Sequence, residues 1–281
     1  MTEIEIGKEM GHSGPRQPVM TPKSESVLLN LSWRAFTVWY RDVKVWTKFY
    51  KASILGNLGE PLLYLLAMGW GLGRMVGTVD GIPYIEFLAP GLICSAAMYA
   101  ATFECTFGSF TRMTRQNTFD AILATPVSLE DIVAGEILWG ATKGFLSGTA
   151  MLLVMSFFGL VKSYWAVLAL GLAFLIGLLF ASLSMIVTAR AAAYDFFSYY
   201  FTLAIAPMFL FSGIFFPVTN LPGWAQTFAW FLPLTHGVTA SRALFSGNVS
   251  WVIAGDLLWL FAFFTVAFII ALRSIRKRLI L

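Results

Sequence analysis

Long stretches without ionisable side chains constrain this chain more than any other feature. Between Lys162 and Arg190 there is no Asp, Glu, Lys or Arg. A helix needs roughly 20 mostly apolar residues to cross the hydrocarbon core of a bilayer. With 58% hydrophobic and 12% charged residues, against roughly 25% charged in soluble domains, the chain has too little polar surface to fold as a globule in water. The sequence therefore predicts an all-α integral membrane protein.

Windows of suitable length and polarity predict six transmembrane helices. They cover approximately residues 55–76, 87–110, 133–159, 164–188, 196–216 and 251–272. The uncharged stretch between Asp195 and Arg242 is long enough for two crossings. Three prolines in its second half, Pro217, Pro222 and Pro233, each remove a backbone hydrogen-bond donor and disturb a helix. We therefore expect short re-entrant helices between spans five and six instead of a seventh crossing.

The distribution of cations predicts the orientation. In a six-span topology, fifteen of the nineteen Lys and Arg residues fall on the side that holds both termini. Arg74, Lys162 and Arg242 fall on the opposite side, and Lys143 lies inside the third span. Because Lys and Arg accumulate on the cytoplasmic side, both termini are predicted to be cytoplasmic. Residues 1–30 lack the apolar run of a signal peptide, and we expect them to form a flexible cytoplasmic N-terminus.

The pattern of aromatic residues and cations in residues 32–51 predicts an N-terminal amphipathic interface helix. At about 100° per residue, aromatic side chains fall on one side and cations on the other. The first side holds Phe36, Trp39, Tyr40, Val43, Trp46 and Tyr50, and the second holds Arg34, Arg41, Lys44, Lys48 and Lys51. The pattern is typical of a helix lying in the headgroup region. Two roles stay open for it, a topology anchor and a docking element for a partner.

The longest predicted cytoplasmic loop, residues 111–131, joins the second and third spans. Asn117 followed by Asp120 predicts a cap and first turn, and a short helix over residues 121–124 should stop before Pro126. Ser128 and Asp131 repeat the capping pattern at the start of the third span. The loop is either a lever for a soluble partner or an ordinary capped turn.

Ionisable residues inside membrane spans are costly and usually functional. Glu60, beside Pro61, is expected to satisfy groups near a helix kink. Glu104 and Lys143 lie at similar depths in neighbouring spans, so we expect an ion pair between them. That pair either fixes the helix register or contacts a substrate head group.

Glycines recur every four residues in two predicted spans, at 69, 73 and 77 and at 140, 144 and 148. This spacing places each set on one helix face and permits close backbone approach. Packing within one subunit and a dimer seam made by the first span both remain possible.

Three segments resemble a known family. Residues 86–144, which include the run RQNTFDAILATPVSLED, closely resemble the permease subunits of type 2 ABC exporters, nearest to the nodulation-protein J branch. The runs GNLGEPL at 56–62 and FSGIFFPVTNLPGW from residue 211 look like the same family. The resemblance covers nearly everything from residue 30 onward. It implies that residues 31–281 form an ABC transporter transmembrane domain in the bacterial inner membrane.

The resemblance also implies partners and sites. Such a subunit dimerises with a second copy of itself and sits on two copies of a separate ABC ATPase. The coupling helix would lie within residues 117–128 and the re-entrant helices within 218–245. The ATPase-coupling residues would be Asn117, Thr118, Phe119, Asp120, Ala121, Ile122, Leu123, Thr125 and Pro126, with Arg34, Arg41, Lys44 and Lys48 of the interface helix also near the ATPase.

The chain carries no nucleotide site of its own. The phosphate-binding pattern GxxxxGK[ST] does not occur, so ATP hydrolysis is expected on a separate partner chain and no cofactor is expected here. We also expect no metal and no nucleic-acid partner. His236 and Asp256 are the only hints of an intramembrane enzyme, and the nucleophile pattern GxSxG is missing.

These observations favour a permease subunit of an ATP-driven exporter for an amphiphilic substrate. Aromatic residues are concentrated between residues 196 and 231, where they either form an interfacial belt or stack on sugar rings and acyl chains. The resemblance points to a lipo-oligosaccharide, while glycolipid and drug-like cargo also fit. The alternative is a stand-alone ion-coupled carrier or channel, which usually places several carboxylates at mid-membrane.

Overall fold

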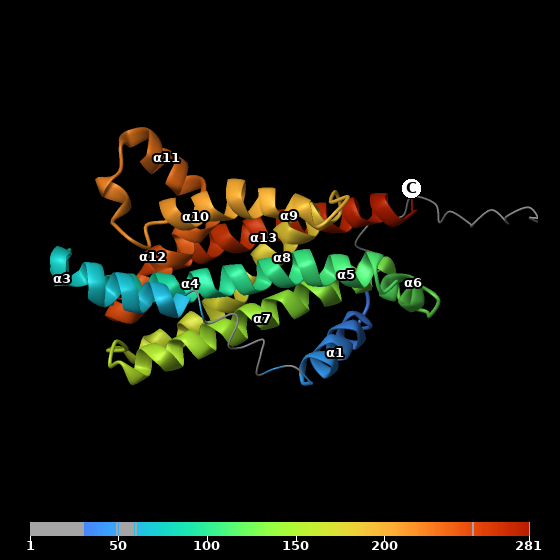
Figure 1. The fold of residues 1–281 in the computed structure, drawn as a ribbon, viewed down its shortest axis with the longest axis horizontal. Helices are drawn as coiled ribbons and strands as arrows, with labels where there is room; N and C mark the ends of the chain where they lie inside the picture. Colours follow the sequence, from blue (N-terminus) through green and yellow to red (C-terminus); the bar gives the residue numbers. More distant parts are fainter. Residues whose placement is uncertain (1–30, 49, 51–58, 60, 249, 281) are drawn as a thin grey trace, which may run out of the picture.

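A computed structural model of the chain describes residues 31–48, 50, 59, 61–248 and 250–280. The predictions made above for residues 1–30, Lys51 and Glu60 concern residues outside this range. The described part is almost entirely helical and forms an elongated bundle (Figure 1).

Most helices follow the predicted windows. In chain order they are α1 (Ala35–Trp46), η1 (Leu65–Leu72), α3 (Gly73–Val76), α4 (Tyr84–Phe103), η2 (Glu104–Gly108), α5 (Ser109–Thr114), α6 (Thr118–Leu123), α7 (Leu129–Phe157), η3 (Tyr164–Leu168), α8 (Ala169–Thr188), α9 (Asp195–Tyr200), η4 (Phe201–Ile205), α10 (Ala206–Phe211), η5 (Val218–Asn220), α11 (Gly223–Phe231), α12 (Pro233–Ser246) and α13 (Trp251–Ile280). The segments η1, η2 and η4 are π-helical turns that continue into α-helix.

A short hairpin connects α3 to α4. Its strands β1 (Thr78–Val79) and β2 (Ile82–Pro83) pair antiparallel. Asp80 and Gly81 at the tip both have positive φ, 51° and 79°. Two successive positive φ values are what a two-residue hairpin turn requires.

Within the described residues, four segments are long and apolar enough to cross a membrane. They are Tyr84–Thr114, Leu129–Phe157, Tyr164–Thr188 and Ile253–Leu279. Pro61–Val76 and Asp195–Phe211 are apolar but shorter. All six overlap the six predicted windows, and six crossings of a membrane stay a prediction.

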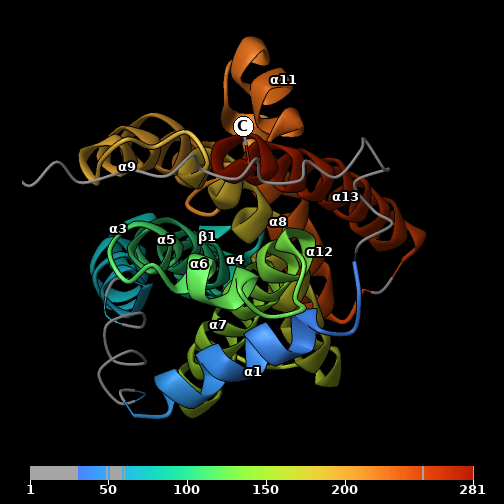
Figure 2. The same cartoon turned by 90° about the vertical axis from the view of Figure 1, so that its right-hand side faces the viewer.

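The long helices α4, α7 and α8 pack on one another, α13 packs on α8, and α1 packs on α7. Figure 2, which looks along the bundle, shows α1 lying across it. The α6 segment lies at one end of the bundle and α3 at the other (Figure 1). The two ends are called the α6 end and the α3 end below.

Glycines bring α7 and α8 together backbone to backbone. A Cβ atom added at Gly177 would lie 2.8 Å from Cα of Ala141, and one added at Gly144 would lie 3.2 Å from Cα of Gly177. The glycines at 140, 144 and 148 therefore pack against other helices of the same subunit, which is the first of the two interpretations above. The other set does not form a single helix face, because α3 ends at Val76 and Gly77 adopts a φ of 73°.

Helices α11 and α12 occupy the segment that three prolines interrupt. Each begins at a proline-marked break: Pro222 precedes α11, and Pro233 is the first residue of α12, where a missing backbone N–H costs nothing. α12 packs against α4 and α13, whereas α11 stands away from the bundle (Figure 1). The predicted short helices are present, and their re-entry into a membrane stays a prediction.

Candidate functional site

A short helix projects from the α6 end of the bundle between α5 and α7 (Figure 1). Phe119 anchors it, because that side chain is 1% exposed and belongs to the main hydrophobic core. Ile122 is half-buried against the same core. The remaining predicted coupling positions are exposed, apart from half-buried Thr118: Asn117, Asp120, Ala121, Leu123, Thr125 and Pro126. The helix therefore projects from the bundle with an exposed outer surface, and the buried side chain of Phe119 fixes it to the hydrophobic core.

The start of α6 corrects one detail of the sequence interpretation. Asn117 takes the N-cap position, but it adopts a left-handed conformation with φ 48° and its side chain makes no capping hydrogen bond. Asn tolerates this conformation better than most residues, so its role is to turn the backbone sharply. The helix begins at Thr118, directly after the predicted cap, and ends at Leu123, one residue before the predicted end and before Pro126.

The capping box predicted at Ser128 is present and has a second function. The Ser128 side chain accepts from the backbone N–H of Asp131, and the Asp131 carboxylate accepts from the backbone N–H of Ser128. The same carboxylate accepts from the backbone N–H and the hydroxyl of Ser32 at 2.6 and 2.9 Å. Arg34 donates to the carbonyl of Pro126. The segment entering α1 is therefore fixed to the middle of the loop between α6 and α7 and to the first turn of α7.

The body of α1 packs on α7 differently from the predicted amphipathic division. Ala35, Val38 and Asp42 are its buried residues. Trp39 donates from Nε1 to the hydroxyl of Thr142 at 2.9 Å, while Phe36 and Tyr40 on the same predicted side are exposed. The face that meets α7 is therefore not the predicted aromatic face, because Ala35 and Val38 pack closely against Gly135 of α7.

Six charged side chains gather where α1, the η2–α5 turn and α7 meet. We call them the charge cluster: Arg41, Asp42, Glu104, Arg112, Glu136 and Lys143. Three carboxylates face three cations, which is the condition under which buried charges are tolerated.

Arg112 lies at the centre of the charge cluster. Its Nη2 lies 2.5 Å from Oε2 of Glu136 and its Nη1 lies 2.8 Å from Oε1 of Glu104. Glu136 is fully buried and also accepts from the hydroxyl of Ser109 at 2.6 Å and from Nη2 of Arg41 at 3.3 Å. Gly108 leaves the space for this arrangement, since a Cβ atom there would lie 2.7 Å from Oε1 of Glu104.

Asp42 connects α1 to the charge cluster. Its Oδ1 lies 2.7 Å from Nη2 of Arg41 and 3.9 Å from Nε of Arg112. Burial, with a contribution from the neighbouring Glu136 carboxylate, raises the pKa of Asp42 from 3.8 to about 7, although the two arginines oppose the shift.

The predicted pair of Glu104 and Lys143 is in contact, with Nζ 3.7 Å from Oε2. The closer partner of Glu104 is Arg112, and Lys143 lies 5.6 Å from the ring centroids of both Trp46 and Trp139. The pair therefore belongs to a larger structural network that joins three elements.

The predicted cations of the interface helix separate into two groups. Arg34, Lys44 and Lys48 are exposed, as a partner-docking surface requires. The placement of Arg41 with them was wrong: it turns toward Asp42 and Glu136 because those buried carboxylates need a cation. Sequence reasoning also missed Asp42, Arg112 and Glu136 as a site. The available signal was Glu136 inside an otherwise apolar span.

His236 and Asp256 lie together at the α3 end, with Nδ1 2.7 Å from Oδ1. The other ring nitrogen of His236 contacts the carbonyl of Trp230 at 2.8 Å, and the ring stacks on Trp259. Both nitrogens are therefore engaged in holding α12 to α13 and to the end of α11. Within the described residues, no three His, Cys, Asp or Glu side chains are placed to hold a metal ion.

Comparison with known proteins gives one family throughout. The profile of the ABC-2 type transporter family matches residues 31–246. Nodulation protein J of Rhizobium meliloti (strain 1021) is 43% identical over 247 residues, which are 88% of this chain and 94% of that protein. Nodulation protein J of Sinorhizobium fredii is 41% identical over 261 residues, covering 93% and 100%. The inner membrane transport permease YadH of Escherichia coli K12 is 24% identical over 222 residues, covering 78% and 86%.

Proposed function

The chain belongs to the ABC-2 type transporter family, and on this premise we propose that it is the permease subunit of an ATP-driven exporter. In this proposal two copies of the chain form the translocation route. Two copies of a separate ABC ATPase bind the α6 end, which faces the cytoplasm. The complex lies in the bacterial inner membrane, with six spans per subunit and both termini cytoplasmic.

The projecting α6 helix carries the proposal. Its exposed surface, with Asp120 and Leu123, is available to a soluble partner, and its buried root at Phe119 is continuous with the core of the bundle. A force applied to the exposed side is therefore transmitted to packed side chains and not absorbed by a loose loop.

Two sets of contacts support the transmission of force beyond α6. The first, which we call the Asp131 clamp, consists of the hydrogen bonds from Ser32 to the Asp131 carboxylate and fixes the entry to α1 to the start of α7. The second is the charge cluster. The charge cluster joins α1, α7 and the end of the second predicted span through ion pairs of 2.5–3.9 Å. A displacement of α6 would move these three elements together, which is what alternation between inward and outward access requires.

We propose an amphiphilic cargo, with lipo-oligosaccharide as the first candidate. The nodulation J proteins that this chain resembles support it, as does the aromatic composition of α9, η4, α10 and α11. Tyr199, Trp224 and Trp230 are among the exposed aromatics and have the amphipathic character that suits sugar rings and acyl chains.

The stand-alone ion-coupled carrier is the weaker candidate. Such a carrier needs ionisable groups that bind and release the coupling ion during the cycle. Glu104, Glu136 and Lys143 lie inside the second and third predicted spans, and each is engaged: both carboxylates pair with Arg112, and Lys143 pairs with Glu104. Their pairing is more consistent with a structural role.

Co-purification with a candidate ABC ATPase, followed by ATPase assays in proteoliposomes, tests the proposal. Asp120→Lys reverses an exposed charge on α6 and should reduce stimulation of ATP hydrolysis by the permease at least tenfold, with membrane insertion unchanged. Asp195→Lys is the matched control, since Asp195 is an exposed acid in the first turn of α9. It should stimulate normally.

Normal stimulation by the Asp120→Lys variant would exclude α6 as the coupling element. Transport by the purified chain alone in vesicles, without any ATPase, would exclude the exporter itself. Mass spectrometry of lipids retained by the co-purified complex would identify the class of cargo.

A further inference from the structure

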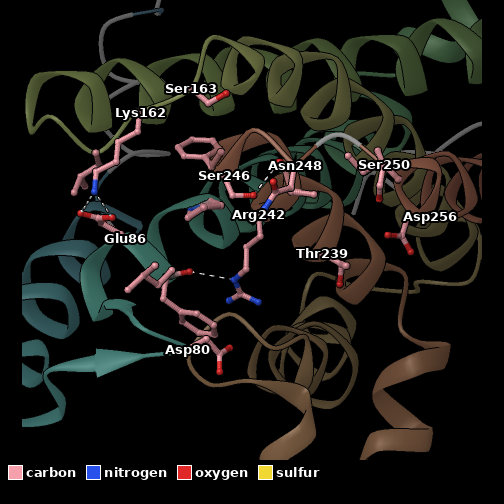
Figure 3. Close-up of a pocket in the computed structure, with 17 residues that line it drawn as sticks. Asp80, Glu86, Lys162, Ser163, Thr239, Arg242, Ser246, Asn248, Ser250 and Asp256 are labelled. Atoms are coloured by element: carbon pink, nitrogen blue, oxygen red, sulfur yellow. Dashed lines mark hydrogen bonds and ion pairs between the residues drawn. The ribbon is translucent and has the colours of Figure 1, made fainter.

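A cavity of about 710 Å³, called the polar cavity below, lies beside the hairpin that follows α3, at the end of the bundle opposite α6. Figure 3 shows the polar and apolar side chains that line it. It is formed by the β1–β2 turn, the start of α4, the segment after α7, α12 and the start of α13. The polar side chains that matter here are Asp80, Glu86, Lys162, Thr239, Arg242 and Ser246. Its volume is in the range of pockets that take small ligands.

Arg242 enters this cavity from α12 as a cation whose observed partners are all neutral. Its Nε donates to the carbonyl of Phe87 at 3.2 Å, and Nη2 donates to the carbonyls of Gly213 and Ile214 at 2.5 and 3.2 Å. The guanidinium also lies 3.7 Å from the ring centroid of Phe87. Among the described residues, no carboxylate lies within ion-pair distance of it. These contacts fix its orientation, and the exposed carboxylate of Asp80 acts on its charge only from beyond ion-pair distance.

Three of the other four charged side chains that line this cavity are already engaged. Lys162 binds both carboxylate oxygens of Glu86 at 2.6 Å, as the dashed lines in Figure 3 show. Asp256 is bound to His236. Asp80 is exposed on the hairpin turn and forms no ion pair within the described part of the chain. Arg242 is therefore the cation that this cavity offers to an added ligand.

An apolar groove of about 660 Å³ continues from the polar cavity, and Ser250 and Ile253 line both. The groove is bounded by the end of η3, α8, α12 and α13 through Leu168, Gly171, Leu172, Leu244, Trp251 and Leu257. Trp251 is 92% exposed, so this groove opens on the outer surface of the bundle. The polar cavity, with Arg242 outside any ion pair in the described residues, therefore adjoins the apolar groove, and Ser250 and Ile253 line both.

We propose that the polar cavity and the apolar groove together bind one acidic amphiphile, with its phosphate, carboxylate or sulfate group on Arg242 and its acyl chain along Gly171 and Leu257. Arginine is a common binder of such oxyanions. Backbone carbonyls take the N–H donors of Nε and Nη2, which orients the guanidinium and leaves the two N–H donors of Nη1 for the headgroup. The hydroxyls of Thr239 and Ser246 already donate to the carbonyls of Thr235 and Ala243 within α12, so Arg242 remains the donor for the headgroup. This inference does not depend on the export function, since the same site serves a resident lipid or a cargo.

Native mass spectrometry of the full-length chain, purified in detergent, tests the site. The probes are phosphatidylglycerol and phosphatidylcholine with identical acyl chains, added at equal concentrations. The wild-type chain should retain phosphatidylglycerol at least tenfold more. Equal retention of the two lipids would overturn the assignment of an acidic headgroup.

Gly171→Phe blocks the groove with little risk to folding, because nothing lies within 4 Å of a Cβ atom at Gly171. Gly255→Phe is the matched control: Gly255 also has open space around its Cβ position, and it lines neither cavity. The first variant should lose phosphatidylglycerol at least tenfold and the second should bind like the wild type. Equal binding by both variants would overturn the proposal.

Arg242→Gln tests the headgroup end and should abolish the preference between the two lipids, whereas Arg242→Lys should retain part of it. Since Arg242 also holds the carbonyls of Gly213 and Ile214, thermal unfolding of both variants must accompany the binding data. If Arg242→Gln fails to fold, lipid binding by the Gly171→Phe and Gly255→Phe variants still tests the proposed site. A folded Arg242→Gln variant that keeps the full preference would contradict the role of this guanidinium.

Discussion

Ser32 donates two hydrogen bonds to the carboxylate of Asp131, which lies 99 positions further along the chain. The same carboxylate completes the capping box of α7 with Ser128. One side chain therefore both begins a 29-residue helix and holds the segment that enters α1. This relationship makes the interface helix part of the bundle.

Asp131→Ala should destabilise the chain more than Ser128→Ala. Loss of a helix cap costs about 1 kcal/mol, and Asp131→Ala also leaves Ser32 without its acceptor, for a total of about 2–3 kcal/mol. Thermal unfolding in detergent measures both. Asp195→Ala, at an exposed helix start, is the control and should have little effect. Equal losses for the two cap variants would contradict the clamp.

Glu136→Gln should be among the most damaging single changes. It removes the carboxylate that Arg112 and Arg41 share and leaves the charge cluster with three cations and two carboxylates, and breaking a buried ion pair in this way costs about 3–5 kcal/mol. The double variant Arg112→Gln/Glu136→Gln should lose much less than the sum of the two single variants, because it removes both members of the pair.

A double-mutant cycle on unfolding free energies measures this coupling. Lys162→Gln with Glu86→Gln is the comparison pair, since Lys162 is 63% exposed and its ion pair is screened by water. Additive losses at Arg112 and Glu136 would show that the charge cluster does not act as a unit.

Stability should depend on pH through Asp42. In the folded chain Asp42 has a pKa of about 7, and in the unfolded chain its carboxyl ionises near 3.8. Between these values the folded state binds more protons than the unfolded state. The contribution of Asp42 to the free energy of unfolding therefore falls as pH rises from about 4 to 7 and stays low above that.

Asp42→Asn removes this contribution. Its melting temperature, compared with that of the wild type at pH 5 and pH 8, should change less between the two pH values. An unchanged pH dependence would show that Asp42 is ionised throughout this range in the folded chain.

Gly177→Ala should destabilise the chain by about 1–3 kcal/mol, because the new Cβ atom would meet backbone atoms of Ala141 that cannot move alone. Gly171→Ala, in the same helix, meets nothing within 4 Å and should be neutral or slightly stabilising. Melting temperatures of the two variants check the backbone contact of α7 and α8. Equal behaviour would contradict it.

Local sequence signals predicted the parts of the fold that depend on a few neighbouring residues. The apolar windows located the long helices α4, α7, α8 and α13, and the Ser128 and Asp131 pair predicted the capping box that is observed. The proline breaks likewise anticipated α11 and α12 as short separate helices. Each of these signals acts within one helical segment.

The charge cluster depended on contacts that no local pattern reports. Arg112 and Glu136 are 24 positions apart, and Arg41 and Glu136 are 95 apart. Helical periodicity placed Arg41 with the outward cations, because periodicity records only the face of a helix and not what the neighbouring helix offers. The same holds for the unpaired Arg242, whose setting is assembled from α4, α12 and the segment around Gly213.

The sequence by itself determined that the chain is helical, apolar and suited to a bilayer, since charge content and window length follow directly from residue types. It also determined the family, because long runs of residues resemble known permeases. The tertiary structure alone decided which charges neutralise one another, where backbones touch, and which cation faces an open cavity. Those outcomes depend on the relative rotation and depth of helices, and these are set by close packing between segments far apart in the chain.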